Sequence, residues 1–85
     1  MEIEIIKRML NNSTWTDPQK QTMFKFSNNN QLSINGKNQK QYSVIKYKNQ
    51  IVLKLGSVRM FSIEYICDFI LQMYSKEEAF TITPA

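Results

Sequence analysis

The stretch Ser13–Lys37 reads "STWTDPQKQTMFKFSNNNQLSINGK", and two short segments within it place an apolar side chain at every second position. Phe24 and Phe26 are separated by a single lysine, and Leu32 and Ile34 by a single serine. Side chains two residues apart in a strand lie on the same face, so this period predicts two β-strands. The asparagine-rich "SNNNQ" between them is typical of a turn.

The same alternation continues to the end of the chain. An Asn-Gly step at 35–36 predicts a tight hairpin turn, because both residues tolerate the positive φ angles that such a turn needs. We expect some seven short antiparallel strands joined by short turns, and closing them into a barrel hides their edges. The later strand segments are "QYSVIKY" (41–47), "IVLKL" (51–55), "MFSIEYI" (60–66), "FILQMY" (69–74) and "AFTITPA" (79–85).

The N-terminal residues follow a different period. Ile3, Ile6, Met9 and Leu10 recur at helical spacing, and two asparagines follow as stop signals. We predict a short amphipathic helix over residues 1–12, with a strand through "EIEI" as the competing interpretation. The predicted fold is therefore all-β: a small antiparallel meander barrel over 14–84 with a short N-terminal helix, in one domain spanning 1–85.

Residues 61–76 permit a second interpretation. Glu64, Asp68, Gln72 and Lys76 recur every four residues and would form one polar stripe on a helix. The alternative fold is then α+β, an antiparallel sheet with a C-terminal helix around residues 62–76. We favour two strands flanking a tight turn at Cys67 and Asp68, because the segment is rich in isoleucine and aromatic residues and continues the earlier strand rhythm.

Composition restricts the classes of function. The 85 residues are 42% hydrophobic and 21% charged, with a net charge of +4, which is ordinary for a small globular domain. The single cysteine, Cys67, cannot form an intramolecular disulfide. The N-terminus does not read as a signal peptide, and no apolar run is long enough to span a membrane. We expect a cytoplasmic protein, unless a leader has been removed.

The side chains for most catalytic chemistry are missing from the sequence. There is no histidine, so the commonest general base and transition-metal ligand are absent. One cysteine without histidine argues against structural zinc, and the acidic residues do not match a calcium loop. Only two glycines are present, too few for a phosphate-cradling loop. We therefore expect no enzyme activity, no metal and no cofactor.

Trp15 is the side chain that we expect to plug the core where the helix meets the first strand, with its indole N–H donating to a carbonyl. The inward aromatic residues have two interpretations, a packed core or the lining of a site for a small hydrophobic ligand at the barrel interior or mouth. The candidate ligand-binding residues are Trp15, Phe24, Phe26, Tyr42, Phe61 and Tyr65.

Several apolar residues fall out of phase with this inward set. A group of them on adjacent strands would form an interaction surface for a protein partner or for a second copy of the chain. The candidates are Met23, Ile45, Tyr47, Val52, Ile70 and Tyr74, with Ile66 also out of phase. Self-association or protein interaction through this surface is the function we favour, and binding of a small hydrophobic ligand is the alternative.

The lysines of the predicted strands provide a third hypothesis. Lys25, Lys46, Lys48 and Lys54 fall on or near outward positions, with Tyr47 nearby. Basic residues interleaved with aromatic ones can bind single-stranded nucleic acid weakly. The same lysines equally suit a solvated face that discourages edge pairing between strands.

The order of these elements resembles the small lipocalin-like domains of the calycin group, in which a short helix leads into a Gly-x-Trp element and an up-and-down barrel. The matching stretches are "LNNSTW" (10–15), "FKFSNNNQLSING" (24–36), "YSVIKYKNQIVLKL" (42–55) and "FSIEYI" (61–66). Two departures stand out. Ser13 replaces the family's glycine, and the arginine that packs over the tryptophan from a late strand has no counterpart, since Arg59 comes too early. The resemblance implies transport of a lipophilic ligand, but short strands with bulky inward residues favour a filled barrel, which argues against a roomy ligand cavity.

Overall fold

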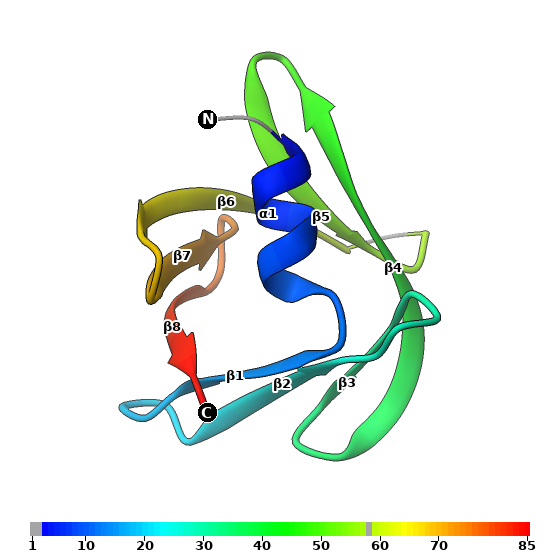
Figure 1. Cartoon of the computed structure of the whole chain (residues 1–85), viewed down its shortest axis with the longest axis vertical. Helices are drawn as coiled ribbons and strands as arrows, with labels where there is room; N and C mark the ends of the chain where they lie inside the picture. The colour runs from blue at the N-terminus through cyan, green and yellow to red at the C-terminus, as the bar shows by residue number, and fades with distance from the viewer. Residues whose placement is uncertain (1–2, 58) are drawn as a thin grey trace.

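The structure is a computed structural model that describes residues 3–57 and 59–85. Within these residues the chain forms one helix followed by eight strands (Figure 1). The elements are α1 (Ile3–Leu10), β1 (Ser13–Asp17), β2 (Thr22–Phe26), β3 (Gln31–Ile34), β4 (Lys37–Tyr47), β5 (Gln50–Leu55), β6 (Arg59–Cys67), β7 (Ile70–Tyr74) and β8 (Ala79–Pro84).

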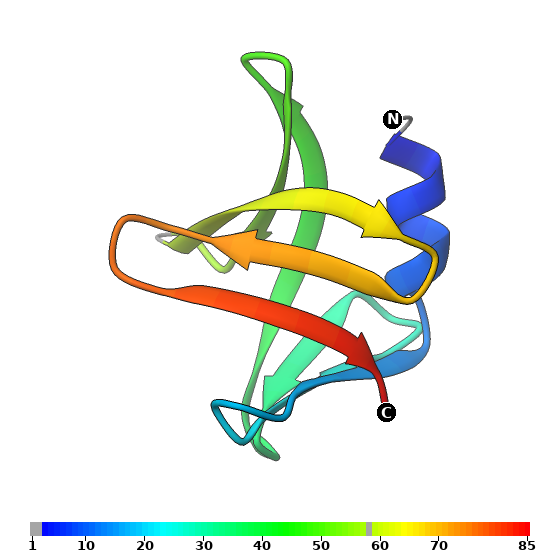
Figure 2. The same cartoon turned by 90° about the vertical axis from the view of Figure 1, so that its left-hand side faces the viewer.

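The eight strands form a closed antiparallel meander barrel in which each strand pairs with the next along the chain. The barrel closes where β1 meets β8, with Trp15 opposite Pro84 and Thr16 opposite Thr83. Figure 1 looks nearly down the barrel, with α1 across the near opening, and Figure 2 shows the same helix at one end of the strands. The predicted all-β meander barrel with a short N-terminal helix is confirmed.

The alternative helix around residues 62–76 is wrong, because this segment forms β6 and β7. Phe61 and Ile63 of β6, and Leu71 and Met73 of β7, are all buried in the core. The polar residues that suggested a helical stripe lie on two paired strands instead, where Glu64 is opposite Gln72. The turn between them falls one residue later than predicted, at Asp68 and Phe69, since β6 includes Cys67.

The structure has eight strands where the sequence predicted about seven, and the additional one is β1 around Trp15. β4 is also longer than expected, because it begins directly after the Asn-Gly turn. Asn35 and Gly36 have φ angles of 55° and 73°, the positive values that the predicted hairpin turn requires. At the N-terminus the described part of "EIEI" is helical, so the competing strand interpretation is wrong there.

Inward side chains from all eight strands and the helix fill the barrel interior. Ile6 and Leu10 of α1 are completely buried and close the near end of the core. Aromatic rings in the interior contact each other edge to face. The ring centroids are 5.2 Å apart for Phe26 and Tyr42 and 5.1 Å apart for Phe24 and Phe80. The interior is therefore a packed core, as short strands with bulky inward residues predict.

Candidate functional site

Trp15 packs in the core at the junction of α1 and β1. Its indole Nε1–H donates to Ser13 Oγ at 2.9 Å and to the Met9 carbonyl at 3.3 Å. The Ser13 hydroxyl donates in turn to the Leu10 carbonyl at 2.6 Å. The predicted plug and its carbonyl bond are both confirmed. Ser13, at the position where lipocalin-like domains carry a glycine, satisfies a carbonyl at the C-terminal end of the helix.

The six residues predicted to line a ligand site lie at or beside the core. Five of them are members of the single buried core cluster, and Tyr65 packs against it from a half-buried position. The Tyr65 hydroxyl donates to the carboxylate of Asp68, which together with burial raises the Tyr65 pKa above its usual value. These side chains pack against one another and fill the interior. Binding of a small hydrophobic ligand at the barrel interior or mouth stays a prediction.

The register of four strands brings several of the predicted surface residues into one line. Ile45 pairs with Val52, Val52 with Ser62, and Ser62 with Tyr74. We call these four residues the outer row, since they alternate with core residues and lie on the outside of the barrel. Val52 is only 4% exposed, so the expectation that it offers accessible surface is wrong.

Some other exposed apolar side chains lie on the strands of this row, and others lie apart from it. Tyr47 and Met60 are exposed on β4 and β6, the strands that carry Ile45 and Ser62. Met23, on β2, is 48% exposed but lies on a strand outside the row, and Ile70 is half-buried at the start of β7. The predicted interaction surface therefore divides: Ile45, Val52 and Tyr74 lie in the outer row, whereas Met23 and Ile70 lie apart from it.

Two opposite charges lie on opposite sides of the outer row. Lys54 follows Val52 by two residues on β5 and pairs with Met60. Glu64 follows Ser62 by two residues on β6, which runs in the opposite direction. Both side chains are exposed. A depression of about 400 Å³ lies beside the row, and its lining includes Ser62, Glu64 and Tyr74.

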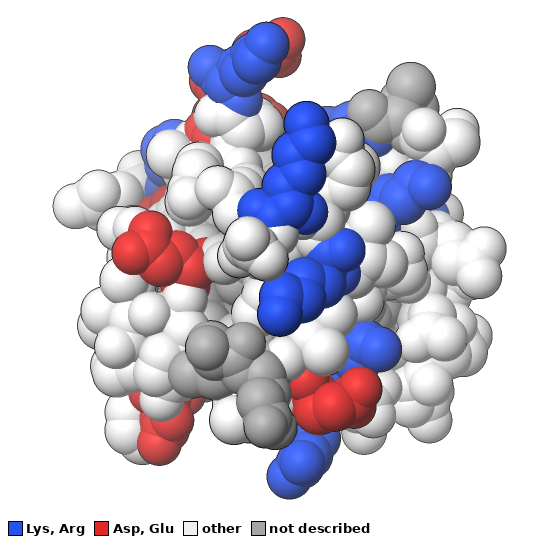
Figure 3. Space-filling model, turned by 90° about the horizontal axis from the view of Figure 1, so that it is seen from above, with Lys and Arg blue, Asp and Glu red and all other residues white. Residues whose placement is uncertain are grey.

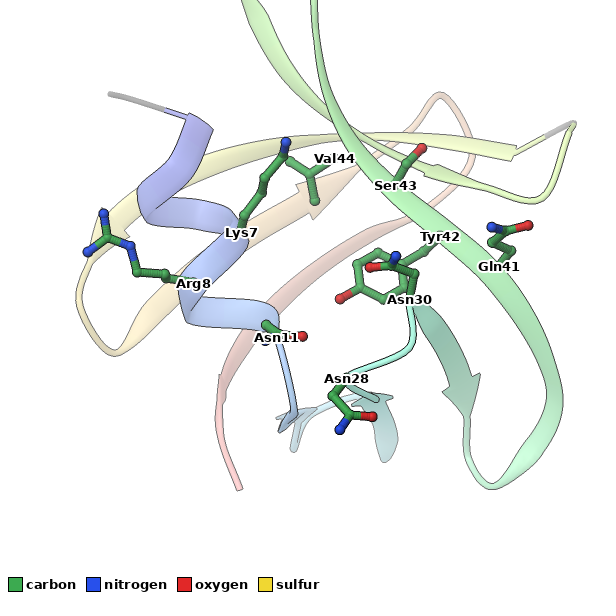
Figure 4. Close-up of a pocket in the computed structure, with 9 residues that line it drawn as sticks. All are labelled: Lys7, Arg8, Asn11, Asn28, Asn30, Gln41, Tyr42, Ser43 and Val44. Carbon is green, nitrogen blue, oxygen red and sulfur yellow. The ribbon is translucent and has the colours of Figure 1, made fainter.

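A groove of about 600 Å³ lies at the helix-covered end, between α1, the β2–β3 turn and β4 (Figure 4). Its lining combines basic and amide side chains. Lys7 and Arg8 line one side, and asparagine and glutamine side chains line much of the rest. The lining residues are Lys7, Arg8, Asn11, Asn28, Asn30, Gln41, Tyr42, Ser43 and Val44. Sequence reasoning missed this site except for Tyr42, although the adjacent cations and the asparagine-rich turn are visible signals.

The opposite end of the barrel carries a second, smaller depression of about 350 Å³. Phe24, Phe61 and Phe80 form its apolar part, and the Phe80 ring lies 4.9 Å from Lys20 Nζ. At its rim Arg59 pairs with Glu78 at 2.6 Å. Because the charged groups at this rim already have partners, the depression offers less unsatisfied chemistry than the groove.

The four predicted nucleic-acid-binding lysines are all exposed. Lys46, Lys48 and Lys54 belong to or flank the β4–β5 hairpin, whereas Lys25 lies on β2. Lys48 Nζ lies 5.3 Å from the ring of Tyr47, so one lysine is already placed over an aromatic face. Nucleic-acid binding by this group stays a prediction.

Among residues 3–57 and 59–85, no group of three or more metal-ligating side chains comes together. Within the same part of the chain, no helix has the length and apolar character needed to cross a membrane. The architecture, an eight-stranded antiparallel closed barrel with a short N-terminal helix, is compatible with a lipocalin-like fold. Comparisons with protein-family models, curated proteins and solved structures gave no match to the chain.

Proposed function

We propose that this domain is a non-enzymatic interaction module that pairs with a second copy of itself through the outer row. A closed barrel has no free strand edge, so association must use side chains on its outer surface. The register that aligns Ile45, Val52, Ser62 and Tyr74 across four strands is the observation that carries this proposal. Tyr74 in the row and Tyr47 and Met60 on its strands are exposed, and exposed apolar side chains grouped on adjacent strands are typical of an interaction site.

The charges that flank the row favour a second copy as the partner. In a two-fold symmetric pair each surface meets itself, so every contact occurs twice. Because Lys54 and Glu64 lie on opposite sides of the row, a two-fold arrangement can place Lys54 of one copy against Glu64 of the other. The exposed ring of Tyr74 supplies apolar contact, and the depression that it lines is a concave surface against which a side chain of the other copy can pack.

The test is sedimentation over a range of concentrations, at about 0.15 M salt to screen repulsion between two positively charged chains. Lys54→Glu alone should place like charges opposite each other and weaken association about tenfold or more. Glu64→Lys alone should do the same, and the double variant, which restores opposite charges, should recover association.

The control is Met23→Lys, which changes an exposed apolar residue on β2, a strand outside the row, and should leave association unchanged. A parent chain that remains monomeric at millimolar concentration overturns the proposal. So does a double charge variant that associates no better than either single one, because the two charges would then not meet.

The proposal also includes kinship with lipocalin-like domains and a cytoplasmic setting. The kinship is supported by the sequence resemblance and by the compatible barrel architecture. The setting is supported by the lone thiol of Cys67, which requires no oxidising compartment for folding.

A further inference from the structure

We propose that the β4–β5 hairpin binds single-stranded nucleic acid, with lysines at its turn holding phosphates and the ring of Tyr47 stacking on a base. This is a second function, and it does not rest on the pairing through the outer row. Three features of the molecule support it: the distribution of charge around the barrel, the geometry of the hairpin turn, and the depression beside that turn.

Charge is distributed unevenly along the chain and therefore around the barrel. Residues 18–63 contain eight lysines and arginines and no aspartate or glutamate, whereas residues 64–85 contain four acidic residues and one lysine. Because each strand pairs with the next, β2–β5 lie on a basic side of the barrel and β6–β8 on a more acidic side. Figure 3 looks down on the end from which the β4–β5 hairpin projects in Figure 1, and it shows Lys and Arg side chains gathered over the middle of that face. A basic side on a chain with an isoelectric point of about 9.3 is the electrostatic pattern typical of a nucleic-acid-binding domain.

The turn of the hairpin places a cation and an aromatic ring side by side. Tyr47 pairs with Gln50, so Lys48 and Asn49 form a two-residue turn, and their φ angles of 49° and 64° fit its tight geometry. Tyr47 is 49% exposed, and Lys48 Nζ lies 5.3 Å from the centre of its ring. A nucleotide bound here therefore has a cation for its phosphate and an aromatic surface for its base within one short turn.

The depression beside this turn can receive a second base. Its volume is about 400 Å³, within the range of about 300–1,000 Å³ that small-molecule sites occupy. Its lining includes Lys46, Asn49, Gln50, Glu64, Tyr65 and Tyr74. The amide groups can donate to and accept from the edges of a base, the carboxylate can accept from a base amino group, and the tyrosine rings can stack on a base face. Lys46 supplies a cation for the adjoining phosphate.

These features favour a single strand over a duplex. In a duplex the bases stack on one another, so neither the ring of Tyr47 nor the depression can reach a base face. The apolar side of α1 packs into the core, and the basic side of the barrel consists of strands and turns. Surfaces of this kind bind single strands by combining phosphate contacts with stacking on aromatic side chains.

The test is fluorescence anisotropy of a labelled, mixed-sequence single strand of about ten nucleotides, a length within the range that one barrel domain covers. The parent chain should bind this strand, and its affinity should fall as the salt rises from about 0.05 to 0.2 M. An abasic strand of the same length keeps the phosphates but offers no bases, so it should bind about tenfold more weakly.

Variants at the turn separate the phosphate contacts from stacking. Lys48→Gln should weaken binding about threefold or more, and it should reduce the slope of log affinity against log salt by about 0.7, the contribution of one phosphate contact. Tyr47→Leu should weaken binding about tenfold because stacking is lost, whereas Tyr47→Phe should bind as tightly as the parent. Lys76→Gln is the matched control, because it removes the same charge from the β7–β8 turn on the acidic side and should leave the affinity unchanged. Tyr47, Lys48 and Lys76 are exposed, so each variant should keep the parent's circular dichroism spectrum.

The proposal is overturned if the parent does not bind at the lowest salt concentration, or if Lys76→Gln weakens binding as much as Lys48→Gln. It is also overturned if an abasic strand or a duplex of the same length binds as tightly as the intact single strand. The depression borders the outer row, so a second copy and an oligonucleotide would compete for it. Binding is therefore measured at micromolar chain, below the concentrations used for sedimentation. Pairing is tested by exchanging the charges of Lys54 and Glu64, so either proposal can fail without the other.

Discussion

Trp15 and Ser13 join the helix to the barrel through a small hydrogen-bond network. The indole N–H reaches Ser13 Oγ and the Met9 carbonyl, and the serine hydroxyl reaches the Leu10 carbonyl. Carbonyls at the end of a helix have no partner within it, so these two side chains replace the missing hydrogen bonds. The tryptophan therefore contributes both buried apolar surface and a donor to a buried junction.

Replacing Trp15 tests these two contributions separately. Trp15→Ala should lower the free energy of unfolding by about 3–5 kcal/mol, the range for loss of a large buried aromatic side chain. Trp15→Phe keeps most of the ring volume but loses the indole donor, so it should cost less. Urea unfolding followed by circular dichroism measures both, and an alanine variant as stable as the parent would contradict the plug role.

Tyr42 gives the stability of the fold a dependence on alkaline pH. Burial raises the pKa of the Tyr42 hydroxyl above its ordinary value of 10.0. The folded chain therefore holds this proton more tightly than the unfolded chain, and the resulting stability is complete below pH 10 and lost as the pH rises beyond it.

The expected outcome is that Tyr42→Phe loses less stability than the parent between about pH 9.5 and pH 11. Urea unfolding at several pH values measures this, with phenolate absorbance following the ionisation directly. Other groups titrate in the same range but are common to both chains, so they cancel in the comparison. Parallel losses in the two chains would contradict burial of the Tyr42 hydroxyl.

At the scale of elements, β1 and β8 form the seam that closes the barrel, and Asp17 extends it. The strands share only two residue pairs. Asp17 is 4% exposed, and its Oδ2 accepts a hydrogen bond from the Thr81 N–H of β8 at 3.1 Å. Its Oδ1 accepts from the N–H groups of Gln19 and Lys20 in the following turn. One carboxylate thus fixes both the turn and the seam.

Asp17→Ala removes the acceptor for these three N–H groups and should destabilise the fold by about 1–3 kcal/mol. Asp17→Asn keeps Oδ1 for the turn but offers Thr81 an amide N–H in place of an acceptor, so its effect should be confined to the seam. Hydrogen exchange at the Thr81 amide should accelerate in both variants. Unchanged exchange at Thr81 would show that the seam does not depend on this carboxylate.

The β6–β7 hairpin shows how tertiary packing decides between two local interpretations. The polar residues at Glu64, Asp68 and Gln72 fit a helix, but Phe61, Ile63, Leu71 and Met73 fit the inward face of two strands. Burying four large apolar side chains in a shared core contributes far more free energy than solvating one polar stripe. The strand interpretation was the correct one for this reason.

At the scale of the whole molecule, closure and filling of the barrel are linked. Eight short strands leave an interior just wide enough for side chains, and aromatic residues from strands that are not paired with each other meet there. The helix then closes one end with Ile6 and Leu10. The space left for a ligand is consequently outside this core, in the groove beside α1 and at the opposite rim.

The candidate sites were only partly predictable from the sequence. Alternation identifies Ile45 and Tyr74 as outward residues, but only the register of β4–β7 places them in one row with Lys54 and Glu64 on either side. The groove unites Lys7 and Arg8 with Asn30 and Gln41, which are more than 20 residues away along the chain. No local pattern reports such a meeting.

By itself the sequence determined seven of the eight strands, the tight Asn-Gly turn, the helix and most of the inward set of residues, because alternation, turn chemistry and helical spacing act over a few neighbouring positions. The tertiary structure alone decided which outward residues share a surface, that Val52 is buried, and that Lys7 and Arg8 line the same groove as Tyr42. The physical reason is that strand register and barrel closure are set by packing of the whole core, and they bring together side chains that are distant along the chain.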